Sequence, residues 1–208
     1  MRVLDVRREG VANSIREAVL ILRSGGVIIY PTDTVYGLGV NAENPKAVLR
    51  VYELKERPRN KFLTIAVSDI EMAGEYAVIK GLEEFLERFL PGAVTFILPK
   101  TDRVIPEINP RAIGIRIPES LITREIVKGL GRAITSTSAN KTSNPPPHSC
   151  NQAIKEIPNA DLAIDCGTLL FRRPSTIVDL TGRKPSLVRE GPVSFKEIME
   201  AYRSLVDR

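Results

Sequence analysis

Strand-length apolar segments alternate with amphipathic helical segments along almost the whole chain, and this alternation restricts the fold more than any other feature. Apolar residues recur at helical spacing over residues 13–23 and 121–130, whereas residues 27–30, 93–98 and 112–117 are short apolar runs. These two patterns predict amphipathic helices and buried strands respectively. Because strands and helices interleave, we expect an α/β protein with a mixed sheet and flanking helices.

Weaker segments extend this pattern. Further strands are predicted at residues 3–6, 62–67, 133–136, 162–164, 176–180 and 187–189. Further helices are predicted from residue 45 towards Pro58, at residues 82–90, at residues 152–156 and after a capping box at Ser194 and Glu197. Between them, residues 138–147 read as a polar, proline-rich loop, and its part at 141–147 is the one candidate hinge.

Length and composition indicate one soluble domain. The chain has 208 residues, 43% of them hydrophobic and 26% charged, so we expect a single folded domain over residues 1–208 and exclude a disordered chain. The apolar runs are far shorter than the roughly 20 residues of a membrane helix. The N-terminus lacks the apolar stretch of a signal peptide, which predicts a cytoplasmic protein with no membrane contact. Cys150 and Cys166 are expected to be reduced thiols.

The scarcity of histidine limits the chemistry. One histidine, His148, and two dispersed cysteines cannot form a His/Cys zinc site, and we predict no metal bound directly by the protein. The net charge of +5 favours an anionic partner such as a nucleotide, a phosphate group or RNA. The excess is moderate and the aromatic content is 5%, so an enzyme with a basic cleft and a nucleic-acid binder fit equally well at this point.

A dense hydrogen-bonding segment follows the strand at residues 27–30. It reads Pro-Thr-Asp-Thr-Val-Tyr-Gly-Leu-Gly over residues 31–39, and it lies at a strand end, where open α/β sheets bind ligands. A polar turn explains it about as well. Its two glycines are not a dinucleotide fingerprint, and the chain has no P-loop, so a bound nucleotide would need another device.

Basic residues supply a candidate for that device. Lys55, Arg57 and Lys61 lie within seven residues and could grip a polyphosphate, although cations at helix C-termini commonly face water. Arg116 and Arg189 lie in apolar strands and need either an anionic partner or a surface salt bridge. The polar segment 136–140 also follows a strand, where hydroxyls and an amide usually cap a helix.

Six separated segments, taken together in their order, resemble the YrdC family. They are residues 31–39, Lys-x-Arg-Pro at 55–58 with Lys61, Gly-Ile-Arg-Ile-Pro at 114–118, residues 136–140, Ser-Thr-Ile-Val-Asp-Leu at 175–180, and Arg-x-Gly at 189–191. The resemblance covers residues 14–192. It implies the family fold, a twisted, open mixed α/β sheet with flanking helices around a deep basic cavity, in the single-domain form.

The resemblance also implies an activity. The best-characterised activity of the family is that of threonylcarbamoyl-AMP synthase, which converts L-threonine, bicarbonate and ATP with Mg²⁺ into L-threonylcarbamoyladenylate and pyrophosphate; a partner transferase then modifies tRNA. The residues implied to hold the nucleotide are Lys55, Arg57, Lys61, Ser138, Asn140 and Arg189, with Lys55 and Arg57 also catalytic. The residues implied to line the threonine and carbamate side are Thr32, Thr34, Tyr36, Arg116 and Ser175.

The residues fit this chemistry. A carbamate oxygen is already anionic and can attack the α-phosphorus without a histidine base, so the step mainly requires alignment and charge neutralisation. The threonine ammonium must first lose a proton, for which Asp33 and solvent bicarbonate are the two candidate acceptors. We expect the Lys55–Arg57 cluster to be exposed, so that substituting either cation would remove turnover and leave the fold intact.

Two other functions remain open at this point. A non-catalytic module could bind tRNA or double-stranded RNA through its positive charge, including Arg7-Arg8 and Arg172-Arg173. A related enzyme could transfer a carbamoyl group to a different acceptor.

The chain departs from the family pattern with Thr137 before Ser138, Pro174 before Ser175, and Phe62 after Lys61.

Overall fold

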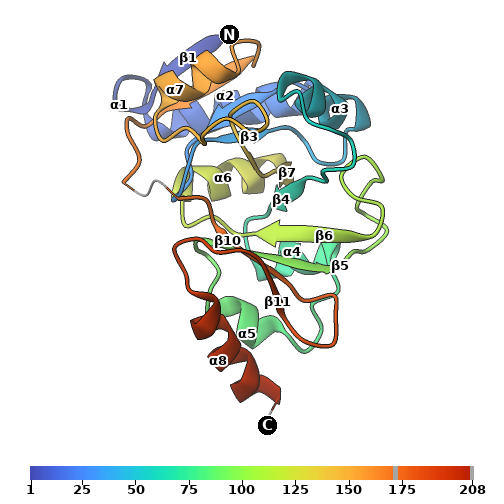
Figure 1. Cartoon of the computed structure of the whole chain (residues 1–208). Coiled ribbons are helices and arrows are strands. Elements are labelled where there is room, and N and C mark those ends of the chain that lie inside the picture. The colour runs from blue at the N-terminus through green and yellow to red at the C-terminus, as the bar shows by residue number, and fades with distance from the viewer. Residues whose placement is uncertain (171–172, 207–208) are drawn as a thin grey trace.

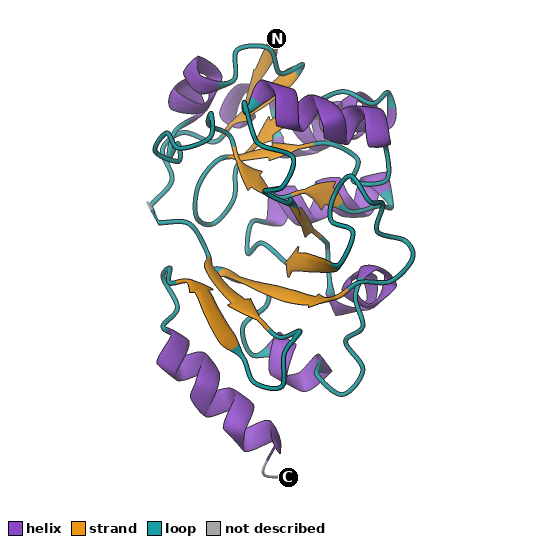
Figure 2. Cartoon of the chain, turned by 45° about the vertical axis from the view of Figure 1, so that its right-hand side comes forward, coloured by secondary structure: helices purple, strands orange, loops and turns teal. Residues whose placement is uncertain are grey.

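The strands form two mixed sheets, one above the other in Figure 1, with helices around them. The computed structural model describes residues 1–170 and 173–206, so Arg172 of the predicted Arg172-Arg173 pair lies outside the described residues. The α/β class with flanking helices is confirmed, but the strands are divided between two sheets where one was expected. The two termini lie at opposite ends of the molecule in both views (Figures 1 and 2).

The first sheet has five strands and contains the N-terminus. Its order is β1 (Arg2–Asp5), β9 (Leu162–Asp165), β2 (Ile28–Tyr30), β3 (Gly37–Gly39) and β8 (Thr137–Ser138). The first three strands are parallel, and β3 is antiparallel to both of its neighbours. The segment between β2 and β3 is therefore a short connection at the carboxyl end of β2.

The second sheet has six strands and lies towards the C-terminus. Its order is β11 (Ser186–Arg189), β10 (Thr176–Asp179), β5 (Val94–Pro99), β6 (Ala112–Arg116), β4 (Thr64–Ala66) and β7 (Ile134–Thr135). Parallel and antiparallel pairs are mixed along it.

The chain crosses from the second sheet to the first at a single residue, Ser136. That residue separates β7 from β8, and its N–H donates to the carbonyl of Thr64 at 2.7 Å. Tyr30 of the first sheet donates its hydroxyl to the carbonyl of Thr135 at 3.0 Å. These contacts join the two sheets at the crossing.

Eight helices flank the sheets in the described part of the chain. They are α1 (Val6–Glu9), α2 (Val11–Arg23), α3 (Pro45–Leu54), α4 (Ile70–Tyr76), α5 (Glu83–Glu87), α6 (Leu121–Leu130), α7 (Cys150–Glu156) and α8 (Phe195–Val206). Side-chain caps explain where several of them begin: Asn44, Asp69, Ser120 and Ser149 each accept a hydrogen bond from a backbone N–H in the first turn. Within the described residues, no helix is both long enough and apolar enough to cross a membrane.

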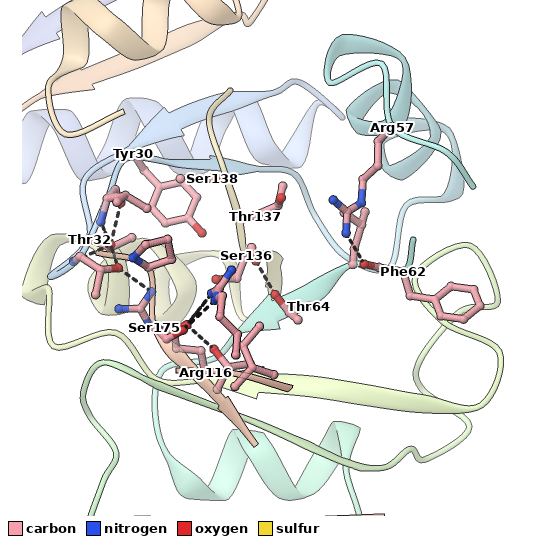
Figure 3. A pocket seen from close by; sticks show the side chains of 18 residues that line it. Tyr30, Thr32, Arg57, Phe62, Thr64, Arg116, Ser136, Thr137, Ser138 and Ser175 are labelled. Atoms are coloured by element: carbon pink, nitrogen blue, oxygen red, sulfur yellow. Dashed lines mark hydrogen bonds between the residues drawn. The ribbon is translucent and has the colours of Figure 1, made fainter. Parts of the chain in front are cut away.

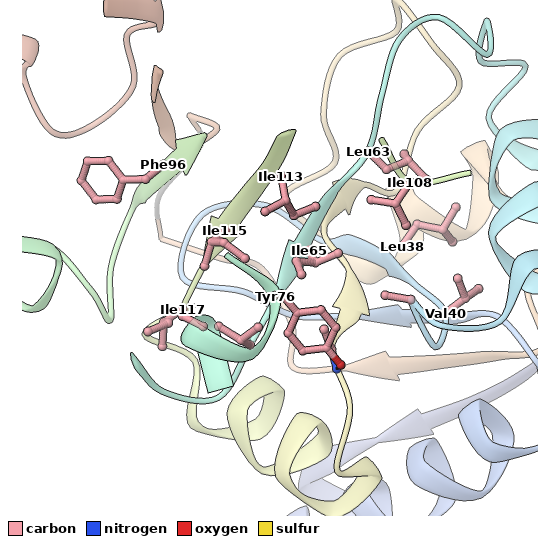
Figure 4. Close-up of a cluster of buried hydrophobic side chains, with 14 of the residues drawn as sticks. Leu38, Val40, Leu63, Ile65, Tyr76, Phe96, Ile108, Ile113, Ile115 and Ile117 are labelled. Carbon is pink, nitrogen blue, oxygen red and sulfur yellow. The ribbon is translucent and has the colours of Figure 1, made fainter. Parts of the chain in front are cut away.

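A large apolar core connects both sheets. Figure 4 shows Leu38 and Val40 from the first sheet region near Ile65, Ile113 and Ile115 of the second, and all of them are buried. Because one continuous core underlies both sheets, the elements that border the space between the sheets are well packed.

Several elements differ from those predicted. The helix expected at residues 82–90 is only α5, Glu83–Glu87; after it the N–H of Phe89 bonds to the carbonyl of Leu86 at 3.0 Å, an i to i−3 contact that tightens the last turn. Strands β3 and β8 lie in segments predicted to be polar loops. Two glycines make β3 unlike a strand in composition, and the ring of Tyr30 occupies the space they leave: a Cβ on Gly37 would meet that ring at 2.6 Å.

Candidate active site

A pocket with a cavity volume of about 160 Å³ lies between the two sheets, beside the crossing at Ser136 (Figure 3). It is lined by Tyr30, Thr32, Thr34, Val35, Gly37, Arg57, Phe62, Leu63, Thr64, Thr95, Arg116, Ser136, Thr137, Ser138, Pro174, Ser175, Ile177 and Arg189. Among the described residues, this lining is rich in hydroxyl groups and contains three arginines but no carboxylate. Such a lining suits an anionic ligand that carries many hydrogen-bond acceptors.

One wall is the turn after β2, which Thr32 organises. The Thr32 hydroxyl accepts the backbone N–H groups of Thr34 and Val35, at 3.0 and 3.2 Å, and donates to the carbonyl of Val35 at 2.7 Å. It also lies 3.0 Å from the hydroxyl of Thr34. Hydroxyl groups stabilise turns in this way. Both threonines are buried, so the polar-turn and ligand-site readings of this segment are compatible.

Arg116, at the end of β6, is joined to the same turn. Its Nη2 donates to Asp33 Oδ1 at 2.7 Å and its Nη1 donates to Thr34 Oγ1 at 2.8 Å. Its Nε donates to the carbonyl of Gly92 at 3.3 Å. The side chains of Arg116 and Asp33 are only 6% and 11% exposed, so the reading of Arg116 as part of a surface salt bridge is wrong.

A second cluster of hydroxyl and guanidinium groups lies beside Arg116. It is formed by Thr95 on β5, Ser175 directly before β10, and Arg189 on β11. The hydroxyls of Thr95 and Ser175 are 2.8 Å apart. Arg189 donates from Nε and Nη2 to the carbonyl of Ser175, at 3.1 and 2.9 Å. Burial, and then the charge of Arg116, lower the pKa of Arg189. Two guanidinium groups that repel each other in one partly buried pocket favour an anion between them.

Arg57 reaches the pocket from the opposite side to Thr32 (Figure 3). Its Nε donates to the carbonyl of Lys61 at 2.7 Å and its Nη2 donates to the carbonyl of Phe62 at 2.8 Å. Burial lowers its pKa. Since a guanidinium group has five N–H donors, these two contacts fix its plane and leave donors for a ligand.

Lys55 is placed differently from Arg57. Its side chain is 2% exposed, and its Nζ donates to the carbonyls of Ser138 and Asn140, the latter at 2.6 Å. Burial, and then the charge of Arg57, lower the pKa of Lys55 to about 7. The expectation of an exposed Lys55 is therefore wrong, and it does not line the pocket.

The chain reversal between these two cations explains the difference. Helix α3 ends with the N–H of Glu56 bonded to the carbonyl of Glu53 at 3.0 Å and the N–H of Arg57 bonded to the carbonyl of Tyr52 at 2.9 Å. This is a Schellman motif, in which the residue at the position of Glu56 is left-handed, and Glu56 has φ 48°. Residues 55 and 57 therefore leave the helix in different directions.

Three other predicted residues lie outside the pocket lining. Tyr36 is fully buried; its hydroxyl donates to the carbonyl of Gly167 at 2.8 Å, and burial raises its pKa. Lys61 is exposed at the surface. Asn140 is buried and donates from Nδ2 to the carbonyls of Lys141 and Asn144, at 2.9 and 2.7 Å. These contacts support the β2–β3 region and the loop after β8.

The structure adds pocket residues that sequence reasoning did not single out. Tyr30, Thr64 and Thr95 all line it, beside Thr137 of the predicted segment 136–140. Burial raises the pKa of Tyr30 to about 12, so its hydroxyl is neutral near pH 7. One usable signal was the alternating glycines 37 and 39, because glycine pairs in a strand often mark an aromatic ring or a ligand lying against the backbone.

The donor set does not suit a metal ion bound by the protein alone. Among residues 1–170 and 173–206, no cluster of three or more His, Cys, Asp or Glu side chains could hold one. The pocket offers hydroxyl and carbonyl oxygens, which fit a magnesium ion that arrives already bound to phosphate groups.

Comparisons with known proteins identify relatives of this chain. Residues 20–191 match the model of the Sua5/YciO/YrdC family, described as telomere recombination. The chain is 34% identical over 196 residues to a Methanocaldococcus jannaschii protein provisionally named a threonylcarbamoyl-AMP synthase, covering 93% of this chain and 92% of the relative. It is 32% identical to the threonylcarbamoyl-AMP synthase of Bacillus subtilis, covering 95% of this chain and 59% of the relative.

Solved structures agree. Pyrococcus abyssi Sua5 in complex with L-threonine superposes with a TM-score of 0.91 at 31% identity, covering 97% of this chain and 61% of that one. Escherichia coli YciO superposes with a TM-score of 0.81 at 28% identity, covering 95% and 98%. This chain thus spans about three fifths of the Sua5 structure and almost all of YciO. The match over residues 20–191 and these relatives show that the chain belongs to the Sua5/YciO/YrdC family.

Proposed function

We propose that this chain converts L-threonine, bicarbonate and ATP into L-threonylcarbamoyladenylate and pyrophosphate. One observation carries the proposal: Arg116 and Thr34, which are hydrogen-bonded to each other, line the same pocket as Arg57 and Arg189. Relatives named threonylcarbamoyl-AMP synthase, and a Sua5 structure with L-threonine, support it. The same relatives favour an enzyme over the RNA-binding module considered from the sequence.

Arg116 is the proposed partner of the threonine carboxylate. Its contacts to Asp33, Thr34 and Gly92 use three of its five N–H donors, one on each nitrogen. One N–H donor remains on each of Nη1 and Nη2, and these two donors are available to a carboxylate. Thr32, Tyr36 and Ser175 are proposed to shape this side, Tyr36 from behind the strand and Ser175 beside Arg189.

The triphosphate is proposed to lie against Arg57, Arg189 and Ser138, with Lys61 and Asn140 further along the same edge. Guanidinium groups fixed by backbone carbonyls are preorganised to receive charge that moves onto phosphate oxygens. Magnesium enters with ATP as part of the substrate and supplies further neutralisation of phosphate charge. Hydroxyl groups of the described pocket lining would hold this magnesium-bound phosphate group.

The reaction follows from the alignment of two anions. A carbamate oxygen of N-carboxythreonine attacks the α-phosphorus, a P–O bond forms, and the bond to the bridging oxygen breaks so that pyrophosphate leaves with that electron pair. The proton of the threonine ammonium must leave earlier. Asp33 Oδ1 is already held by Arg116 and by the N–H of Glu119, at 2.7 and 3.2 Å, so solvent bicarbonate is the simpler acceptor.

The product defines the next step. A mixed anhydride of a carbamate and AMP is a reactive acyl donor, so we propose that a separate transferase carries its threonylcarbamoyl group to tRNA. The synthase is proposed to act as one domain over residues 1–208 in the cytoplasm.

Pyrophosphate release tests the proposal. Purified protein with MgATP should release pyrophosphate only when threonine and bicarbonate are both present, and omission of either should reduce the rate to background. Release that is independent of threonine, or no release with all substrates supplied, would show that the chain is not this synthase. Arg124→Gln is a matched control, because Arg124 lies on α6 outside the pocket lining and should retain full activity.

A further inference from the structure

The loop after β8 forms one edge of the pocket and is held from outside it. Ser136, Thr137 and Ser138 line the pocket, and the chain then turns away through residues 140–144. Asn140 Nδ2 bonds two carbonyls of this loop, and Glu156 Oε2 accepts the N–H of Lys141 at 3.0 Å and the side-chain amide of Asn144 at 2.8 Å. The last paired residue of β8 is Ser138, opposite Gly37, and the N–H of Ala139 still donates to the carbonyl of Tyr36 at 2.9 Å.

Lys55 and Glu56 supply further anchors from the end of α3. Lys55 makes three hydrogen bonds to the loop. Its Nζ donates to the carbonyls of Ser138 and Asn140, and its own carbonyl accepts the N–H of Thr142 at 2.8 Å. Glu56 pairs with the ammonium of Lys141. Both ends of the segment 138–142 are therefore tied to Lys55, and Lys141 between them is tied to Glu56.

We infer that Lys55 is a positioning residue: it clamps the segment 138–142 so that Ser138 faces the nucleotide, and it makes no contact with the phosphates. The inference rests on the proposed nucleotide site but departs from the direct role that the family resemblance implied. Its side chain is 2% exposed and absent from the pocket lining, whereas Arg57, two residues on, lines the pocket.

The chemistry of the contact supports a holding role. Backbone carbonyls turned towards one another repel, and a single amine nitrogen between them removes that repulsion and satisfies both acceptors. A neutral amine still has two N–H donors, which is enough for two carbonyls, so the clamp holds at either protonation state of Lys55.

Limited proteolysis of the protein without any ligand separates clamping from phosphate contact. Trypsin cleaves after Lys141, inside the clamped segment. In Lys55→Met we expect cleavage after Lys141 to accelerate at least tenfold, with cleavage after Arg111, in the connection between β5 and β6, unchanged as the internal control. Arg57→Met, which removes a pocket cation bonded to Lys61 and Phe62, should leave the Lys141 site as slow as in the native chain. Equal rates at Lys141 in native protein and Lys55→Met would overturn the inference.

ATP titration at several salt concentrations gives the second readout. Lys55→Met should weaken ATP binding about tenfold with an unchanged dependence on salt, and leave threonine binding unchanged. Arg57→Met should reduce the salt dependence, since it removes a charge that meets the phosphates. A reduced salt dependence in Lys55→Met would instead show direct phosphate contact and contradict the inference.

Lys55→Gln serves if the methionine variant fails to fold. Its amide can reach the carbonyls with fewer and weaker bonds, so the proteolysis rate at Lys141 should lie between those of native protein and a released loop. Because proteolysis is measured without substrates, its outcome stands even if the protein fails to release pyrophosphate. Pyrophosphate release with an unaltered Lys141 site in Lys55→Gln would reject the clamp and keep the synthase.

Discussion

The proposed threonine side of the pocket and its loop side, residues 138–142, are held in different ways. On the threonine side, Thr32, Thr34 and Arg116 sit at the ends of β2 and β6 and bond to one another directly. On the loop side, residues 138–142 are held mainly through their backbone, by Lys55 and by other residues that do not line the pocket. One side is thus shaped by the pocket residues themselves, and the other by residues behind it.

This difference indicates where substitutions should act. Changes on the threonine side should alter binding and folding together, because the same buried bonds do both. Changes behind the loop should alter nucleotide binding while the sheets and the threonine side remain intact. The following predictions test that separation.

Arg116→Leu should have the largest effect. It removes the proposed carboxylate partner and leaves Asp33 buried without its cation, which typically costs about 3–5 kcal/mol of folding free energy. Threonine binding should become undetectable by calorimetry, and denaturant unfolding should show the stability loss. Arg116→Lys keeps the charge without the planar fork and should fall between the two. Native-like threonine affinity in Arg116→Leu would show that this side has been assigned wrongly.

Gly37→Ala tests whether the threonine side depends on the β2–β3 pair. The new Cβ would lie 2.6 Å from the buried ring of Tyr30, which has little room to move. Overpacking of this kind costs about 1–3 kcal/mol, measured by thermal or denaturant unfolding. Gly182→Ala is the control, because the nearest atom would be 3.7 Å away. Equal stability of both variants would contradict the packing described.

The pH dependence of stability tests the burial of Lys55 on the loop side. Its pKa is about 7 in the folded protein and 10.5 as the ordinary value, so the unfolded chain binds more protons between these limits. Stability attributable to this lysine therefore rises with pH from about 7 to 10, by at most about 1.4 kcal/mol per pH unit. Lys55→Met should lose that rise in denaturant titrations at pH 7, 8 and 9. Parallel pH profiles for the two proteins would show that Lys55 is not buried as described.

Ser175→Ala should have the smallest effect, because it removes one hydroxyl at the meeting of the two sides. It leaves the buried Thr95 hydroxyl without this partner, while the Ser175 carbonyl still holds Arg189. A lost hydrogen bond of this kind costs about 0.5–1.5 kcal/mol. Expressed as weaker threonine binding, this is roughly a fivefold increase in the KM for threonine. Ser175→Thr keeps the hydroxyl and should stay near native. A hundredfold loss in Ser175→Ala would mean that this hydroxyl contacts the reacting groups.

The α/β class and the strand-end position of the pocket could be predicted from the sequence, whereas the arrangement of the loop side could not. Thr32, Arg116 and Arg189 follow or lie in apolar strands, and the paired strands bring them into one pocket. The burial of Lys55 could not be predicted from the sequence. The left-handed residue after the helix is Glu56, whereas a glycine normally marks such a helix end. The two-residue strand β8 was equally hidden, since so short a segment has no period.

The division into two sheets was also invisible in the sequence. The residues before and after Ser136 pair with different sheets, and that choice depends on contacts with β4 and β3 that are distant in the chain. Tertiary contacts of this kind override local propensity.

The central claim is that the pocket joins the carbamate of threonine to the α-phosphate of ATP. Incubation with MgATP, threonine and [¹³C]bicarbonate, followed by mass spectrometry of the adenylate, tests it most directly. We expect an adenylate that contains threonine, AMP and one ¹³C carbon. An unlabelled threonyl adenylate would mean that the amino-acid carboxylate is activated instead, and would contradict the assignment of Arg116 as the group that holds that carboxylate.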